Sequence, residues 1–138
     1  MATYTVTGAV AGIPVGHKAQ VIEVVLDFST TALATGEDID VFEIPANTLV
    51  LNAGIEVLTL ASTGSPTLDL GDGTAADTWV TDVAGHTAVG FEIGSTPIMY
   101  SAANNIDMKA ITADFDGKVR VFATVVPMGA AETAAAFA

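Results

Sequence analysis

The sequence contains no cysteine and very few basic residues. Without cysteine, its 138 residues can form no disulfide bond and no thiolate metal site. Lysine and arginine together number four, against 16 aspartates and glutamates, so the formal net charge is −12. Nucleic-acid binding requires a field of the opposite sign, and an anionic membrane surface would repel the chain. We therefore expect neither a nucleic acid nor a membrane among its partners.

Charged residues of both signs together are also scarce. They make up 14% of the sequence, against roughly 25% in an average globular domain, whereas 51% of the residues are hydrophobic. A surface with so few charges is expected to be partly covered by partner chains. No apolar run reaches the length of a membrane span, and the N-terminal residues lack the basic and apolar segments of a signal peptide.

Helical periodicity is missing except in the Ala-rich last residues, while short alternating runs separated by turn residues recur along the chain. This pattern predicts an all-β fold, a single-domain β-sandwich that is jelly-roll-like and has about nine strands. We divide the chain into an N-terminal arm or edge segment (1–18), the β-sandwich (19–126) and a C-terminal tail (127–138). The tail could form a short helix or an arm that docks on a neighbour.

Two predicted strands carry charges at matching spacing. Residues 19–28 place Glu23 and Asp27 on one side, and residues 117–126 place Lys118 and Arg120 on one side. Opposite charges on neighbouring strands stabilise a sheet when they face each other. We therefore predict that these two strands are neighbours and that their charges pair.

A third strand, 37–44, alternates strictly in the sequence. This alternation predicts that Asp38, Asp40, Phe42 and Ile44 share one side of the strand. An acidic strand start of this kind is typical of a solvated sheet edge.

Three aspartates around a glycine-containing loop form a candidate calcium site. Asp69, Asp72 and Asp77 have the spacing D-x-x-D-G-x-x-x-D, and oxygen ligands from a short loop suit Ca²⁺. The spacing differs from the EF-hand pattern and lacks its terminal glutamate, and Asp-Gly is also an ordinary turn signal. A calcium site and a plain turn both remain open, and no other cofactor is indicated.

No motif in the sequence indicates catalysis. His17 and His86 are isolated and are expected in exposed loops, and the G-x-S-x-G nucleophile elbow is missing. The acidic cluster at 37–40 has no neighbouring feature that would raise a carboxyl pKa for glycoside hydrolysis. We therefore expect no enzyme, and we place Trp79 and Tyr100 in the core or at an interface.

Four stretches, taken in order, resemble a family of small structural proteins of tailed bacteriophages of the capsid decoration, or cement, type. They are ATGEDIDVFEIPANTLVLNAGIEVLT (34–59), TLDLGDG (67–73), MYSAANNIDMKA (99–110) and KVRVFATVV (118–126). Their order and spacing carry the resemblance, which covers residues 30–126. It implies a β-sandwich or jelly-roll protomer and homo-oligomers, often trimers, outside an icosahedral shell. It brings no catalytic residues.

From this resemblance we expect a non-enzymatic virion structural protein, a capsid decoration protein that binds and stabilises the outside of a phage head. Its partners would be further copies of itself, as a homotrimer, and the shell of major capsid protein. It would reside on the capsid surface after synthesis in the bacterial host cytoplasm. Two alternatives stay open. One is a calcium-dependent adhesin or carbohydrate-binding β-sandwich, and the other is a component of the phage tail or fibre.

Overall fold

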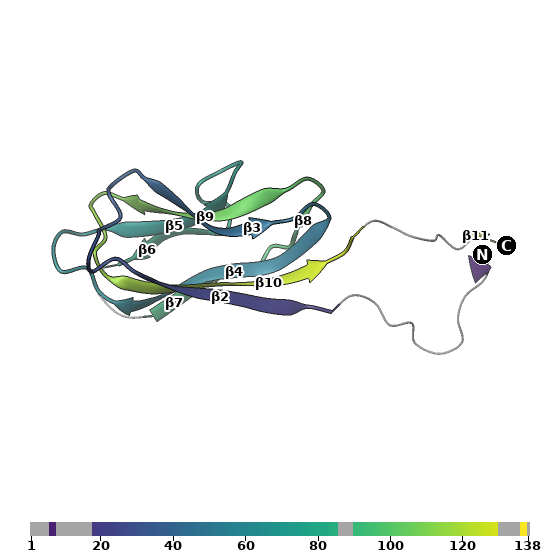
Figure 1. The fold of residues 1–138 in the computed structure, drawn as a ribbon, viewed down its shortest axis with the longest axis horizontal. Helices are drawn as coiled ribbons and strands as arrows, with labels where there is room; N and C mark the ends of the chain where they lie inside the picture. Colours follow the sequence, from purple (N-terminus) through teal and green to yellow (C-terminus); the bar gives the residue numbers. More distant parts are fainter. Residues whose placement is uncertain (1–5, 8–17, 86–89, 130–135, 138) are drawn as a thin grey trace.

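The computed structural model describes residues 6–7, 18–85, 90–129 and 136–137. The described chain has no helix, and nine of its strands form two antiparallel sheets packed face to face (Figure 1). Two further short strands, β1 (Val6–Thr7) and β11 (Ala136–Phe137), pair with each other in antiparallel orientation. Within the described ranges, no helix is long and apolar enough to span a membrane. The predicted all-β sandwich is therefore confirmed.

The two sheets have five and four strands. In the five-stranded sheet the order is β2-β10-β4-β7, and β8 also pairs with β4. Its strands are β2 (Gln20–Asp27), β4 (Thr48–Thr59), β7 (Gly90–Gly94), β8 (Ile98–Tyr100) and β10 (Lys118–Pro127). The four-stranded sheet has the order β3-β9-β5-β6. Its strands are β3 (Asp38–Ile44), β5 (Thr67–Asp72), β6 (Val80–Ala84) and β9 (Asn104–Ile111).

The order of pairing is that of a jelly roll. Strands pair from the two ends of the sandwich sequence inward: β2 with β10, β3 with β9, β4 with β7 and β8, and β5 with β6. This nesting folds one long antiparallel hairpin across two sheets. The partner of β4 is divided into β7 and β8 around Pro97, which cannot donate a hydrogen bond to a ladder. The jelly-roll prediction with nine strands is confirmed.

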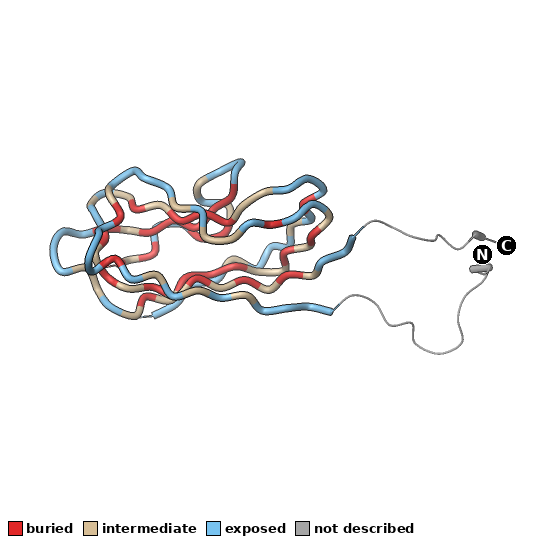
Figure 2. The backbone as a smooth tube through the Cα atoms, viewed as in Figure 1, coloured by how far each residue is buried: buried red, intermediate tan, exposed pale blue. Residues whose placement is uncertain are grey.

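The core lies between the sheets, and Figure 2 shows buried residues in both layers of the sandwich. Alternation decides which side chains enter it. In β10 every second residue is buried, namely Val119, Val121, Ala123 and Val125. Burying one such aliphatic side chain stabilises the fold by about 1.5–3 kcal/mol. The residues between them point outward and remain available for contacts with other molecules.

Strand β3 departs from simple alternation. A register shift against β9 falls between Asp40 and Phe42, which leaves Val41 as an extra residue. As a result, Asp38 and Asp40 are exposed, whereas Phe42 packs against the core and Ile44 is buried. The prediction that Asp38, Asp40, Phe42 and Ile44 share one side is wrong, because a bulge reverses the side on which all later residues lie.

The sandwich begins and ends at the same place. Gln20 at the start of β2 pairs with Val125 near the end of β10, so the chain enters and leaves at one end of the sandwich (Figure 1). Most of the predicted arm (1–18) and tail (127–138) lies outside the described residues, and the division into these segments stays a prediction. Within the tail, Ala136–Phe137 is a strand.

Candidate interaction surface

Large apolar side chains gather on the outward side of the five-stranded sheet. Six of them are exposed in the described chain, and the strand registers place five of these six on this side. Together with three half-buried residues they form what we call the apolar face: Val21, Val25, Leu49, Phe91, Ile93, Met99, Phe122 and Val126. Exposed apolar side chains that gather on one side of a sheet mark a candidate site of contact with another molecule.

At the centre of the apolar face, an aromatic ring lies over a glycine. A Cβ atom on Gly54 would lie 2.6 Å from the ring of Phe122 and 2.5 Å from the carbonyl oxygen of Glu92. No side chain fits there, so the ring of Phe122 lies directly over the backbone of β4. The face therefore presents an aromatic surface at its middle.

A band of ion pairs crosses the apolar face. Arg120 Nη1 donates to Glu56 Oε1 at 2.9 Å, and Arg120 Nε lies 3.7 Å from Glu23 Oε2. Next to it, Lys118 Nζ lies 3.9 Å from Asp27 Oδ2. The prediction that these strands are neighbours with paired charges is confirmed. With two cations against three carboxylates, this side of the protein is nearly neutral.

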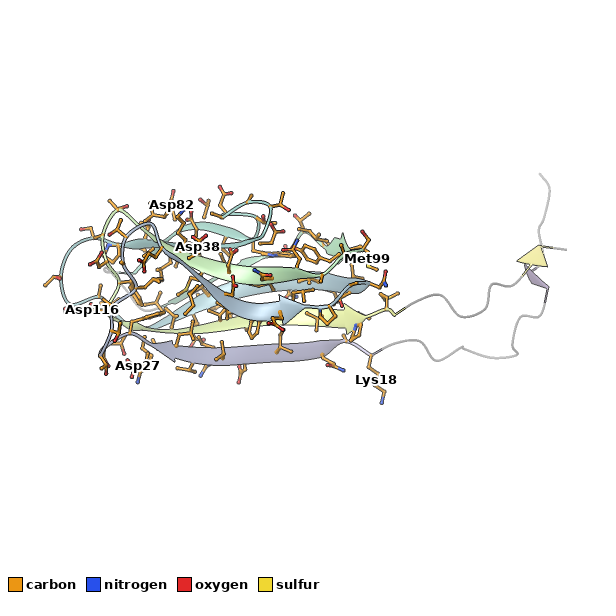
Figure 3. All side chains as sticks on the ribbon, turned by 45° about the horizontal axis from the view of Figure 1, so that its top comes forward. Lys18, Asp27, Asp38, Asp82, Met99 and Asp116 are labelled. Atoms are coloured by element: carbon orange, nitrogen blue, oxygen red, sulfur yellow. The ribbon has the colours of Figure 1, made fainter. Side chains whose placement is uncertain are left out.

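The outward side of the four-stranded sheet is acidic. We call it the acidic face, and its carboxylates are Asp38, Asp40, Glu43, Asp69, Asp82 and Asp107. Lys109 lies among them, with its Nζ 3.8 Å from Asp38 Oδ1. Figure 3 shows Asp38 and Asp82 on the opposite side of the sandwich from Asp27. With six carboxylates and one lysine, the acidic face carries a formal charge of −5, against −1 on the apolar face.

Asp107 lies in a groove of about 390 Å³ on the acidic face. The residue is only 8% exposed. Burial, together with the nearby carboxylates of Asp38, Asp40 and Asp72, raises the pKa of Asp107 to about 6. The acidic face therefore carries one carboxyl group that changes its charge near neutral pH.

The three aspartates of the predicted calcium site point in different directions. Asp69 lies on the acidic face, and its Oδ1 accepts a hydrogen bond from the backbone N–H of Asp82 at 2.8 Å. Asp72 is buried at the end of β5, and Asp77 is exposed in the loop that follows. Among the residues that the structure describes, no three acidic or histidine side chains lie close enough to hold a metal ion. Calcium binding at these aspartates stays a prediction.

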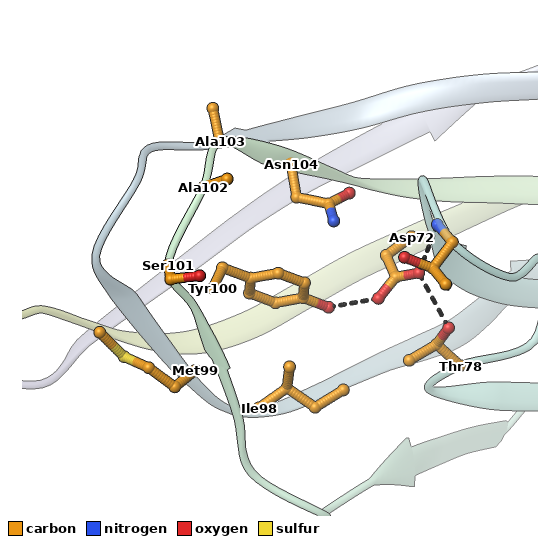
Figure 4. Close-up of a pocket in the computed structure, with 10 residues that line it drawn as sticks. Asp72, Thr78, Ile98, Met99, Tyr100, Ser101, Ala102, Ala103 and Asn104 are labelled. Atoms are coloured by element: carbon orange, nitrogen blue, oxygen red, sulfur yellow. Dashed lines mark hydrogen bonds between the residues drawn. The ribbon is translucent and has the colours of Figure 1, made fainter.

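Asp72 connects the two sheets. Its Oδ2 accepts a hydrogen bond from the hydroxyl of Tyr100 in β8 at 2.6 Å (Figure 4). Its Oδ1 accepts from the backbone N–H groups of Thr74 (2.9 Å) and Ala75 (3.1 Å). The hydroxyl of Thr78 donates to the same oxygen at 3.0 Å. Burial alone would raise the pKa of Asp72, but these hydrogen bonds outweigh it and hold the pKa below its ordinary value.

An open depression of about 440 Å³ lies beside this contact. Figure 4 shows Ile98, Met99 and the small side chains after Tyr100 along its walls. Burial, followed by the hydrogen bond to Asp72, raises the pKa of the Tyr100 hydroxyl. Both oxygens of Asp72 and the hydroxyl of Tyr100 are engaged with each other or with neighbours, so this pair holds structure together rather than serving as an acid or base. Trp79 and Tyr100 are both buried, which agrees with their prediction as core residues.

The chain shares its fold with chains in phage capsids. A chain in the capsid asymmetric unit of cyanophage Pam1 has a TM-score of 0.65 and 21% identity, covering 86% of this chain and 91% of that one. A chain in the capsid of Ralstonia phage GP4 has a TM-score of 0.66 and 15% identity, covering 89% and 93%. A chain in the acid-stable capsid of Helicobacter pylori bacteriophage KHP30 has a TM-score of 0.61 and 11% identity, covering 88% and 94%. No protein-family model and no curated protein sequence matches the chain.

Sequence reasoning missed the apolar face as a unit and the titrating group at Asp107. The outward positions of Val21 and Val25 follow from alternation, but their union with Phe91 and Ile93 depends on the neighbours of β10 and β4. The two histidines, His17 and His86, lie outside the described residues.

Proposed function

We propose that this protein is a non-enzymatic capsid decoration, or cement, protein that binds and stabilises the outside of an icosahedral phage head as a homo-oligomer. The observation that carries the proposal is the separation of an apolar face from an acidic face on a jelly roll. The same fold occurs in chains of three phage capsid structures. The proposal places the protein in the virion, with the capsid shell and further copies of itself as partners.

The two faces suit a protein that attaches to a shell on one side and faces solution on the other. Removing apolar surface from water contributes about 25 cal/mol for each Å² buried, so the apolar face can supply binding free energy in a contact. The acidic face keeps a strong negative field in solution, which limits association between decorated particles. A protein that must attach firmly on one side and repel on the other needs such a separation.

The placement of the two ends of the sandwich supports the homo-oligomer in this proposal. Because β2 begins beside the end of β10, the predicted arm and tail leave together at one end of each copy. Segments that leave together can both reach one neighbouring copy. A symmetric trimer would hold the shell at three equivalent points, and such multivalent binding greatly exceeds the affinity of a single point.

Image reconstruction of the parent virion tests the function. We expect jelly-roll density on the outer surface of the head, in symmetric sets that follow the icosahedral lattice. Density confined to the tail or fibre, or no density in the virion, would contradict the proposal. The mass in solution tests the oligomer separately, since a trimer has three times the chain mass of 14.0 kDa. A stable monomer would remove the homotrimer from the proposal.

A further inference from the structure

The two outward sheet surfaces of this protein differ in the free energy needed to remove them from water when a partner covers them. Covering the acidic face would desolvate a group of carboxylates that have one lysine among them. Desolvating charges that lack a partner of opposite sign carries a large free-energy penalty. Covering the apolar face removes apolar side chains from water and leaves its charges already paired within the sheet. A protein partner therefore gains more by contact with the apolar face.

The exposed side chains of the apolar face come from two separate regions of its sheet. Val21 and Val25 lie on β2, at one edge, and are 71% and 49% exposed. Phe91 and Ile93 lie on β7, beyond β4, and are 67% and 46% exposed. Between these two groups the ring of Phe122 lies over Gly54, and Arg120 forms ion pairs with Glu23 and Glu56. A broad, gently twisted surface of this shape fits another broad surface rather than a peptide or a small molecule.

The size of the face distinguishes between two occupants. Four strands about 4.8 Å apart, each about eight residues long at about 3.3 Å per residue, cover roughly 500 Å². Stable pairs of proteins bury about 800 Å² of accessible surface on each partner, so a face with this flat footprint is a small contact for a pair of copies. A shell that offers many equivalent sites to one oligomer makes up for a small contact through multivalency. The area therefore favours a shell over a second copy.

We propose that the apolar face is the surface that docks on the outside of the phage head, against an apolar and nearly uncharged area of the shell. The acidic face then points away from the shell into solution. This orientation rests on the proposed function and adds to it the side of the protein that makes the contact. Arg120, held between Glu23 and Glu56, lies inside the contact and gives it polar specificity.

Binding to heads that lack this protein tests the proposal. Heads from the parent phage with the gene deleted are mixed with the purified full-length protein, and bound protein is measured after sedimentation. The test variants are Val21→Asp and Phe91→Asp, at side chains exposed enough for the fold to tolerate the change. The matched control is Thr81→Asp, which adds the same charge at an exposed position of β6 in the other sheet. Thermal melting verifies that each variant is folded, and Ile93→Ser replaces either variant that is not.

We expect the wild type and Thr81→Asp to bind equally. Each test variant should bind at least about ten-fold more weakly, as is common when an apolar interface anchor is lost. If the test variants bind like the control while the wild type binds, the docking face is wrong and the proposed function stands. If the wild type itself does not bind, the proposed function fails. If sedimentation velocity shows that the test variants break the oligomer, the face is covered by a second copy, and the docking proposal is overturned.

Discussion

Replacing Tyr100 by phenylalanine removes one hydroxyl group from the contact between the two sheets. That hydroxyl donates to Asp72 Oδ2 at 2.6 Å, and both residues are buried. A hydrogen bond to a charged group contributes about 1.5–3 kcal/mol, so we expect Tyr100→Phe to lower the free energy of unfolding by about 2 kcal/mol. For a chain of 138 residues this corresponds to a fall in Tm of about 7 °C.

The pH dependence of this loss distinguishes the hydrogen bond from simple packing. The folded protein holds the pKa of Asp72 below its ordinary value, partly through Tyr100. A lowered pKa means that the stabilisation is present above the unfolded pKa of about 4 and is lost as the pH falls through the folded pKa. The difference in Tm between wild type and Tyr100→Phe should therefore be full at pH 7 and shrink below about pH 4.

The neighbouring substitution Ile98→Val is the control for Tyr100→Phe. It removes one methylene group from a side chain packed against the same core and costs about 1 kcal/mol, with no ionisable group involved. Its effect on Tm should be the same at pH 7 and below pH 4. A Tyr100→Phe loss that stays constant over this range, or a loss below about 0.5 kcal/mol, would refute the view that the Tyr100–Asp72 hydrogen bond holds the sheets together.

Two further predictions concern the other carboxylates. Because the pKa of Asp107 is raised to about 6, its contribution to stability is full below the unfolded pKa of about 4 and is lost as the pH rises through 6. Asp107→Asn should therefore have a higher Tm than wild type at pH 8, with the difference shrinking toward pH 4, and equal Tm values at pH 8 would contradict this. Adding Ca²⁺ to about 1 mM should leave Tm unchanged, because Asp69 and Asp72 already accept hydrogen bonds from protein donors. A calcium-dependent rise in Tm that a chelator reverses would instead support the site at Asp69, Asp72 and Asp77.

Much of the fold could be predicted because strands are encoded locally. Alternation placed Glu23 and Asp27 on one side of β2 and Lys118 and Arg120 on one side of β10, and the matching charges identified these strands as neighbours. The same reasoning failed in β3, where the bulge at Val41 reverses the alternation. A bulge inserts a residue without a distinctive sequence signal, so its position depends on the partner strand.

The sequence by itself determined that the chain forms a β-sandwich, that it is strongly acidic and that its surface is poor in charges. These properties depend on residue composition, on net charge and on short-range alternation, and they can be read without knowing which strands pair. The tertiary structure decided that six carboxylates share the outward side of one sheet, and that five of the six exposed large apolar side chains of the described residues share that of the other. It also brought Asp38, Asp40 and Asp107 together from two strands, so that burial and mutual repulsion raise one pKa to about 6. Such neighbours are distant in sequence, and only the pairing of strands across the jelly roll places them side by side.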